Sequence, residues 1–230
     1  MKIIKAADRF HADMGEIKSD FLFTFGDYVD HSNMNLGHIR IFNDDKVWAG
    51  AGFPMHAHKY YEIVTIILDG WEITHEDSLG NKDTIWKNQI QVMNTSSGVE
   101  HSEMNHSDKQ VSLYQLWLAP WKQAMEPSYY IKDFKAKDFK NNLVTLATGL
   151  EGEDWENTLL SPVRIHRGIF DAWESISMSY ENHILVYVTS GKVSIWANVM
   201  DAKDQLRSSA GGTVNLDFTE ASEVLIVEAL

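Results

Sequence analysis

Short stretches of β-branched or alternating residues, separated by turn signals, run along most of the chain. The clearest are residues 62–68, rich in isoleucine and valine, and residues 71–75, which alternate apolar and polar side chains. An Asp-Gly pair ending at Gly70 lies between them and is a hairpin-turn signal. Further strands are expected at residues 90–92 and 111–118. This pattern predicts an all-β protein built from sandwiches or barrels.

Two short histidine motifs, His56-x-His58 and His101-x-Glu103, stand within this pattern. In an extended strand, residues i and i+2 project to the same face, about 6.5 to 7 Å apart along the strand. Two such strands side by side would bring three imidazoles and one carboxylate together. These ligands suit Fe, Mn, Co, Ni, Cu or Zn, and the absence of cysteine excludes thiolate sites. The sequence therefore predicts one divalent transition-metal site formed by His56, His58, His101 and Glu103.

The second half of the chain resembles the first. The segment around Gly191 mirrors the segment around Gly70, and a gapless alignment on these glycines puts Ser177 and Ser179 in the place of the first histidine pair. Residues 224–227, an apolar run, fall about where the second motif would recur. We therefore expect the second copy to have no metal ligands and to serve a structural role.

The lysine-rich stretch at residues 129–140 is expected to be a solvated linker between the two halves. We accordingly predict an N-terminal metal-binding domain at residues 1–120, a connector at 121–145 and a C-terminal domain at 146–230.

Composition and charge narrow the possible functions. The chain has 230 residues, 44% of them hydrophobic, which is enough for one large or two small cores. Its net charge of −13 divides into −7 for residues 1–120 and −6 for residues 121–230, so neither half is basic, which argues against direct nucleic-acid binding. No apolar run approaches the roughly 20 residues of a membrane span, and the charged start does not resemble a secretion signal. A cytoplasmic protein without a membrane or nucleic-acid partner is expected.

An ordered set of motifs links the chain to a known family. They are Asn43-Asp44-Asp45, GFPMHAH at 52–58, EIVT at 62–65, HEDSLGN at 75–81 and GVEHSEMN at 98–105. This set resembles the pirin family of bicupins. The resemblance covers nearly the whole chain and is weaker in the C-terminal half.

The resemblance implies two stacked antiparallel β-barrels with few short helices. It places one metal, usually iron, in the N-terminal barrel, with Ni, Co, Cu, Mn and Zn as alternatives. Several pirin-like proteins are quercetin 2,3-dioxygenases, so the resemblance implies an oxidoreductase that opens the ring of a flavonol-like aromatic substrate with O2. The alternative is a metal-binding regulatory protein that acts through a protein partner without turnover. Departures from the family pattern at Ala57 and at residues 59–61 leave the substrate's identity open.

The chemistry expected at the site suggests roles for the residues around it. Glu103 is expected to be the general base that takes the proton of the flavonol hydroxyl. Three residues are candidates for the apolar pocket wall, and three more are candidates for holding the ligands in orientation. The first set is Phe53, Met93 and Met104, and the second is Glu62, His75 and His106.

Overall fold

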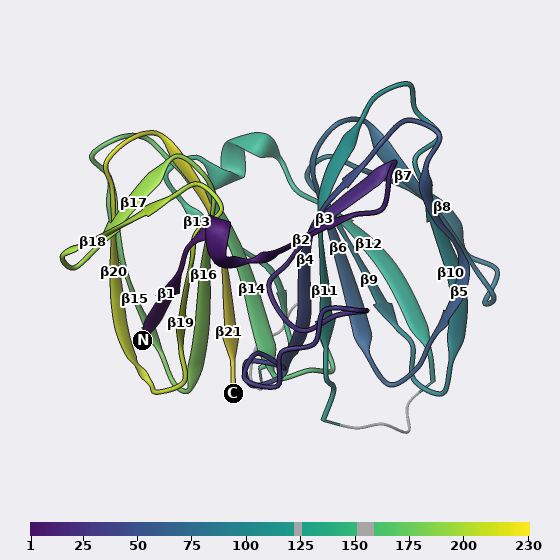
Figure 1. Ribbon diagram of the computed structural model, residues 1–230, viewed down its shortest axis with the longest axis horizontal. Helices are drawn as coiled ribbons and strands as arrows, with labels where there is room; N and C mark the ends of the chain where they lie inside the picture. The colour runs from purple at the N-terminus through teal and green to yellow at the C-terminus, as the bar shows by residue number, and fades with distance from the viewer. Residues whose placement is uncertain (122–125, 151–158) are drawn as a thin grey trace. The chain divides into compact units, whose positions relative to one another are not determined.

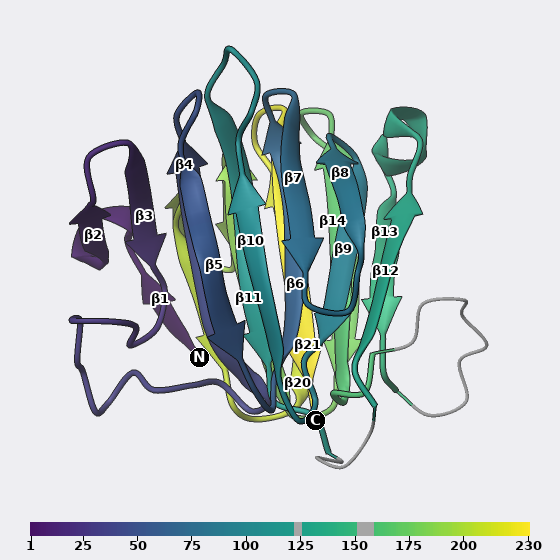
Figure 2. The same cartoon turned by 90° about the vertical axis from the view of Figure 1, so that its right-hand side faces the viewer.

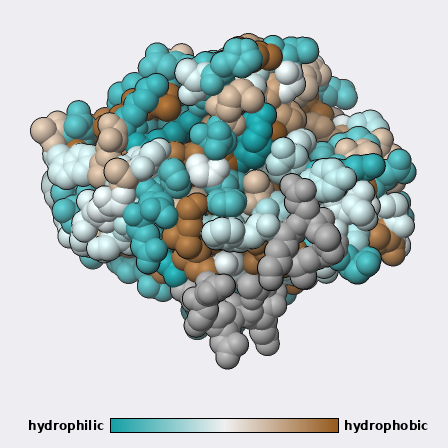
Figure 3. All heavy atoms as spheres, turned by 90° about the horizontal axis from the view of Figure 1, so that it is seen from below, coloured by the Kyte–Doolittle hydropathy of each residue, from teal (hydrophilic) through white to brown (hydrophobic). Residues whose placement is uncertain are grey.

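The computed structural model describes residues 1–121, 126–150 and 159–230. These residues form twenty-one strands and two short 3-10 helices, η1 (Ala6–Asp8) and η2 (Ala136–Phe139), which confirms the predicted all-β class. None of the described helices is long and apolar enough to cross a bilayer. The chain divides into two compact units, each containing two antiparallel sheets (Figure 1). Hydrophilic residues cover most of the face drawn in Figure 3, with hydrophobic residues in small groups between them.

The N-terminal unit comprises residues 10–35 and 39–134. Its larger sheet has the strand order β12-β9-β6-β11-β4-β3-β2, and its smaller sheet the order β5-β10-β7-β8. Figure 2 shows the four strands of the smaller sheet side by side. The strands are β2 (Phe10–Asp13), β3 (Ile17–Phe21), β4 (Ile39–Val47), β5 (Gly52–His58), β6 (Glu62–Asp69), β7 (Glu72–Asp77), β8 (Lys82–Trp86), β9 (Gln89–Asn94), β10 (Val99–Met104), β11 (Val111–Leu118) and β12 (Ser128–Asp133).

The apolar core of this unit lies between its two sheets. Val47, Ile67 and Leu113 from the larger sheet form one buried cluster with Ile73 and Ile85 from the smaller sheet. Period-two alternation puts these side chains on the inner faces, and burying each of them stabilises the fold by about 1.5 to 3 kcal/mol. Farther along the same strands of the larger sheet the inward positions become polar.

Gly70 carries the chain from one sheet to the other, so the predicted hairpin is wrong. β6 belongs to the larger sheet and β7 to the smaller one, and they do not pair. The backbone φ of Gly70 is +98°, and a Cβ there would lie 2.6 Å from the backbone oxygen of Gln110. The turn signal marks a true reversal of the chain. A corner between facing sheets has the same local sequence as a hairpin, since both need a glycine between two alternating strands.

The C-terminal unit comprises residues 1–9, 36–38 and 135–230. Its sheets have the orders β1-β19-β16-β21-β14-β13 and β15-β20-β17-β18. One large apolar cluster fills the space between them. The strands are β1 (Lys2–Ile4), β13 (Leu143–Thr148), β14 (Val163–Phe170), β15 (Ser175–Tyr180), β16 (His183–Ser190), β17 (Lys192–Ile195), β18 (Asn198–Asp201), β19 (Gln205–Ser208), β20 (Gly212–Phe218) and β21 (Ser222–Ala229).

The unit boundaries differ from the predicted domain limits. β1 pairs with β19, so the start of the chain belongs to the C-terminal unit, where Lys5 Nζ also donates to Asp204 Oδ2 at 2.6 Å. The predicted connector, residues 121–145, contains β12, which pairs with β9 in the N-terminal unit, and the start of β13. β12 and β13 each end a sheet, and lysines are common on such edges because they discourage further strand pairing. Of the four lysines at residues 129–140, only Lys132 lies on an edge strand, β12, whereas Lys135, Lys137 and Lys140 lie in or beside η2.

Both units share one strand order, and this corrects the alignment of the internal repeat. β20 pairs with β15 as β10 pairs with β5, so β20, rather than residues 224–227, is the counterpart of the strand that carries the second motif. Ser177 and Ser179 on β15 are exposed, whereas Ile176 and Met178 pack against the core. The inward positions of β15 are therefore apolar, and the serines face the other way.

Candidate metal centre

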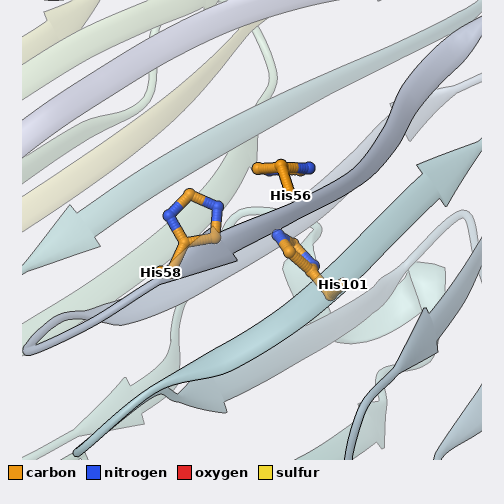
Figure 4. A group of neighbouring side chains, drawn as sticks. All are labelled: His56, His58 and His101. Carbon is orange, nitrogen blue, oxygen red and sulfur yellow. The ribbon is translucent and has the colours of Figure 1, made fainter.

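Three histidine side chains meet on the inner face of the smaller N-terminal sheet. His56 and His58 stand on β5, and His101 stands on the neighbouring strand β10, directly opposite His56. One ring nitrogen of each histidine lies within 4.8 Å of the others. The three rings gather around a common space (Figure 4). We call these residues the histidine cluster.

A β-bulge in β5 sets the direction of His56. The residue opposite β10 changes from His56 at His101 to Phe53 at Glu103, so β5 has one extra residue there. Pro54 lies in this bulge of an edge strand, where its missing N–H breaks no ladder hydrogen bond. Its carbonyl oxygen is 2.7 Å from His56 Nδ1 and accepts a hydrogen bond from it. The proton of the neutral ring is thus on Nδ1, and Nε2 keeps its lone pair.

The Nε2 atoms of His58 and His101 are buried and lack a hydrogen-bond partner among the described residues. Burial, with a smaller contribution from the neighbouring histidines, lowers the pKa of His58 to about 4 and that of His101 to about 3. Both rings are therefore neutral at pH 7, which is the form that binds a metal. Buried acceptors without a partner are costly and rare. Two of them beside a third imidazole fit a metal ion that supplies the missing partner.

Glu103 lies beside the cluster, but the larger sheet holds its carboxylate. The residue is 2% exposed. Its Oε1 accepts a hydrogen bond from Thr65 Oγ1 at 3.0 Å, and its Oε2 accepts one from Gln115 Nε2 at 2.6 Å. The carboxylate charge acts on His58, whose pKa it raises against the larger effect of burial. Glu103 is not part of the compact three-nitrogen group. Each of its oxygens retains a lone pair for a metal ion or a proton.

His75 and Asp77 on β7 support His101 from the neighbouring strand. Burial alone would raise the pKa of Asp77, but hydrogen bonds from Asn81 and His75 outweigh it and lower the pKa. The ionised carboxylate accepts a hydrogen bond from His75 Nε2 at 3.1 Å. The unprotonated His75 Nδ1 lies 3.5 Å from His101 Nδ1. His75 Nδ1 thus lies near both Gln91 Nε2, at 3.3 Å, and His101 Nδ1, so that His101 has its Nδ1 toward β7 and its Nε2 left for the cluster.

Trp117 forms an aromatic wall next to the cluster. Its ring is edge-on to the His58 ring, with the ring centroids 4.7 Å apart. The Tyr61 ring is tilted against the Trp117 ring, with the ring centroids 5.7 Å apart. Trp117 Nε1 donates to Gln115 Oε1 at 3.1 Å, so Gln115 joins the wall to the carboxylate of Glu103. The site thus combines apolar ring surface with a fixed carboxylate, as small-molecule sites usually do.

Comparison with known proteins shows the family to which the chain belongs. Residues 4–118 match the sequence profile of the pirin family, half of the chain. The chain belongs to the pirin family. This confirms the resemblance found in the sequence. The pirin bicupin fold is also confirmed, with the qualification that each unit is a pair of sheets rather than a closed barrel.

Several relatives cover nearly the whole of this pirin. A protein of Pseudomonas aeruginosa named "Putative quercetin 2,3-dioxygenase PA1210" is 33% identical over 95% of this chain and 94% of its own. A protein of Escherichia coli K12 named quercetin 2,3-dioxygenase is 30% identical over 97% and 96%. The crystal structure of an E. coli pirin in complex with nickel(II) superimposes with a TM-score of 0.91 at 28% identity, covering 99% of this chain and 98% of that one.

The three residues predicted to form the apolar pocket wall lie as follows. The Phe53 ring lies 6.4 Å from the His56 ring and also packs against the apolar core. Met93 is fully buried in a small apolar cluster against which Trp117 packs. Met104 sits over Gly52, where a Cβ would lie 2.8 Å from its sulfur.

Two predicted residues have their contacts elsewhere. Glu62 is buried, and its charge raises the pKa of Tyr130, whose burial has the larger effect. His106 is exposed, and its charge acts on Glu76. Of the three residues expected to orient the ligands, the structure therefore places His75 in contact with the cluster and gives Glu62 and His106 other neighbours.

Sequence reasoning missed the polar residues that support the site. Asp77 follows His75 at the same i, i+2 spacing as the metal motifs, a signal available in the sequence. Thr65 pairs with Gln91 on one side and with Gln115 on the other, on the inner face of otherwise apolar strands. Polar residues at inward positions of a strand indicate a functional interior, because an unpaired buried polar group is costly.

Proposed function

We propose that this pirin holds one divalent transition metal between the Nε2 atoms of His56, His58 and His101, with Glu103 as the fourth ligand. The observation that carries the proposal is the pair of buried, unpartnered Nε2 atoms on His58 and His101. The resemblance favours iron, and an E. coli pirin has been solved with nickel(II). Three imidazoles and a carboxylate suit either ion.

We further infer that the protein is a dioxygenase that opens the ring of a flavonol with O2, in line with the name of its E. coli relative, quercetin 2,3-dioxygenase. The bound metal would supply the Lewis-acid and redox chemistry of this reaction. Glu103 would accept the proton of the flavonol hydroxyl, because its oxygens retain lone pairs and Thr65 and Gln115 hold them in place. Trp117 and Tyr61 would bind the flat rings and exclude water.

Oxygen uptake with quercetin tests this function. The metal-free protein is loaded anaerobically with iron, nickel, cobalt, copper or manganese, and metal content is measured beside turnover. At least one form should consume O2 with quercetin. Glu103→Gln should lower the rate by about 100-fold or more. Glu100→Gln is the matched control, since Glu100 is exposed on the same strand, and its rate should not change.

Metal content separates the two halves of the proposal. Forms that bind one metal per chain but leave quercetin intact would contradict the dioxygenase and support the regulatory alternative, which acts through a protein partner. Protein that binds no metal would contradict both.

A further inference from the structure

The C-terminal unit contains a cavity of about 520 Å³, widely open to solvent, at the end strands of its two sheets. β13 ends the larger sheet and β15 ends the smaller one, and residues of both line the cavity together with residues of β14 and β21. A cavity of this size accommodates a small organic molecule. The cavity lies in the C-terminal unit. In this unit β15 is the counterpart of β5, and the inward positions of β15 are apolar.

A hydrogen-bonded chain of polar side chains forms one side of this cavity. Glu228 Oε1 accepts hydrogen bonds from His166 Nε2 at 2.9 Å and from Arg164 Nη1 at 3.1 Å. Burial would raise the pKa of Glu228, but His166 and Arg164 outweigh it and lower the pKa. The carboxylate therefore fixes the proton of His166 on Nε2. Thr145 Oγ1 lies 3.1 Å from His166 Nδ1 and donates to it, so the threonine oxygen keeps lone pairs that can accept from a ligand.

The fold itself does not require this polar chain. Glu228 pairs with Arg164 across β21 and β14, and the corresponding pair in the N-terminal unit is Trp117 and Ile41 across β11 and β4. Both His166 and Glu228 are 7% exposed. Burying charged groups is costly, and apolar residues at these positions would give a comparable fold. Such clusters beside a cavity are candidates for functional sites.

Four apolar side chains also line the cavity. They are Leu143, Phe170, Ile176 and Met178. Phe170 is held by a parallel stack on Phe218, with ring centroids 4.2 Å apart and planes within 8°. Apolar side chains around a fixed aromatic ring favour a planar, apolar ligand body.

The ionisable side chains that line the cavity indicate what net charge a ligand can carry. Besides His166, the ionisable lining residues are Arg164 and Glu228, and they are paired with each other. The charges of Arg164 and Glu228 therefore offset each other within the lining. Thr145, Ser177 and Ser179 provide hydroxyl groups for hydrogen bonds. We propose that this cavity binds an uncharged phenolic compound, with its ring against Phe170 and Met178 and its hydroxyl group donating to Thr145.

Resorcinol is a suitable probe for this site. It is an uncharged aromatic diol whose meta hydroxyl groups do not chelate a metal, so its binding is separate from the chemistry proposed for the histidine cluster. The experiment uses the full chain, metal-free and labelled with 13C at the methionine methyl groups. Titration with resorcinol should shift the Met178 methyl signal to saturation. The signals of Met93 and Met104, which lie in the N-terminal unit, should stay in place.

Variants connect the shift to the cavity. Ser177→Trp places an indole at the open rim of the cavity, which Ser177 lines, and should abolish the Met178 shift. Ser175→Trp is the matched control, because Ser175 is exposed on the same side of β15 but does not line the cavity, and it should bind resorcinol as wild type does. Thr145→Val keeps the shape but removes the hydroxyl, and should weaken binding about five-fold or more.

The proposal makes a sharp distinction between ligands. Benzoate, which is charged, and cyclohexane-1,3-diol, which lacks the aromatic ring, should each bind at least ten-fold more weakly than resorcinol. Equal binding of benzoate would overturn the assignment of an uncharged ligand. An unmoved Met178 signal at millimolar resorcinol, or the same shift in Ser177→Trp, would overturn the site itself.

Discussion

The same three positions are polar in the N-terminal unit and apolar in the C-terminal unit. Thr65 lies five residues before Gly70 and pairs with Gln91 and Gln115. Five residues before Gly191, Val186 pairs in the same register with Leu206 and Ile226, and all three are fully buried in the core.

This difference shows how one fold serves two roles. In the N-terminal unit, Gln115 and Thr65 hold Glu103, and Gln91 Nε2 reaches His75 Nδ1 at 3.3 Å. In the C-terminal unit the three corresponding positions hold branched apolar side chains, which stabilise by burial alone. A metal site of this kind therefore needs a polar layer on the sheet opposite its ligands as well as the ligands themselves.

The largest expected effect is the loss of metal from one unit alone. His101→Ala removes an unpartnered Nε2 atom and should abolish stoichiometric metal. His166→Ala removes a buried histidine of the C-terminal unit and should leave metal content unchanged. Elemental analysis of purified protein measures both. Equal metal loss in the two variants would erase the proposed difference between the units.

Exchanging the residues of the polar layer should damage both units in different ways. Gln115→Ile removes a donor from the buried Glu103 carboxylate, so it should cost about 2 to 3 kcal/mol of unfolding free energy and weaken metal binding about 10- to 100-fold. Ile226→Gln buries an amide among apolar side chains, so it should cost about 2 to 5 kcal/mol. Chemical denaturation and metal titration measure these effects. A neutral Ile226→Gln would show that the C-terminal core is less apolar than the structure has it.

Asp45 should make the stability of the N-terminal unit depend on pH. Burial raises its pKa to about 7, with the charges of Asp44, Glu103 and Asp20 adding to the rise although Ser19 donates to it. Since the pKa of this group in the unfolded chain is about 3.8, stability is full below that pH and is lost as pH rises through 7.

Asp45→Asn removes this loss. Its stability relative to wild type should increase by up to about 1.4 kcal/mol per pH unit between pH 4 and 7, and then level off. Denaturation curves across this range measure the slope. A difference that is constant with pH would contradict a buried, raised Asp45. The corresponding residue in the C-terminal unit is Gly168, which pairs with Val224 as Asp45 pairs with Leu113.

The smallest effect tests what the two units share. Gly70 and Gly191 both have positive φ, and a Cβ at Gly191 would lie 2.3 Å from the backbone oxygen of Ala221. Alanine at either position should cost about 1 to 3 kcal/mol, by similar amounts. Gly80→Ala is the control, since Gly80 has a positive φ with no atom within 4 Å of its Cβ, and it should cost less. Unequal effects at Gly70 and Gly191 would mean that the two corners are not equivalent.

The sequence predicted the ligands better than their supports. The i, i+2 spacing is a local signal, and strand geometry converts it directly into a shared face for His56 and His58. The partners Gln115 and Thr65 come from the opposite sheet, and their meeting with Glu103 depends on tertiary packing that no local pattern encodes. Asp77 is the exception, because it repeats the same spacing after His75.

The fold was predicted at the level of class and family, and its connections were not. The corner at Gly70 looks like a hairpin because alternation specifies a strand's faces without specifying its partners. The pairing of β1 with β19 joins residues about 200 positions apart, which composition cannot show. The repeat was visible at the glycines, but a gapless alignment set the wrong face of β15 against the histidines.

Anomalous X-ray scattering at the metal edge, from crystals of the iron- or nickel-loaded protein, tests the central claim most directly. The proposal predicts one strong peak per chain, within about 2.0 to 2.2 Å of the Nε2 atoms of His56, His58 and His101. No peak should appear near His166 and Glu228 in the C-terminal unit. A single peak in the C-terminal unit, or a loaded crystal with none at the histidine cluster, would contradict the account.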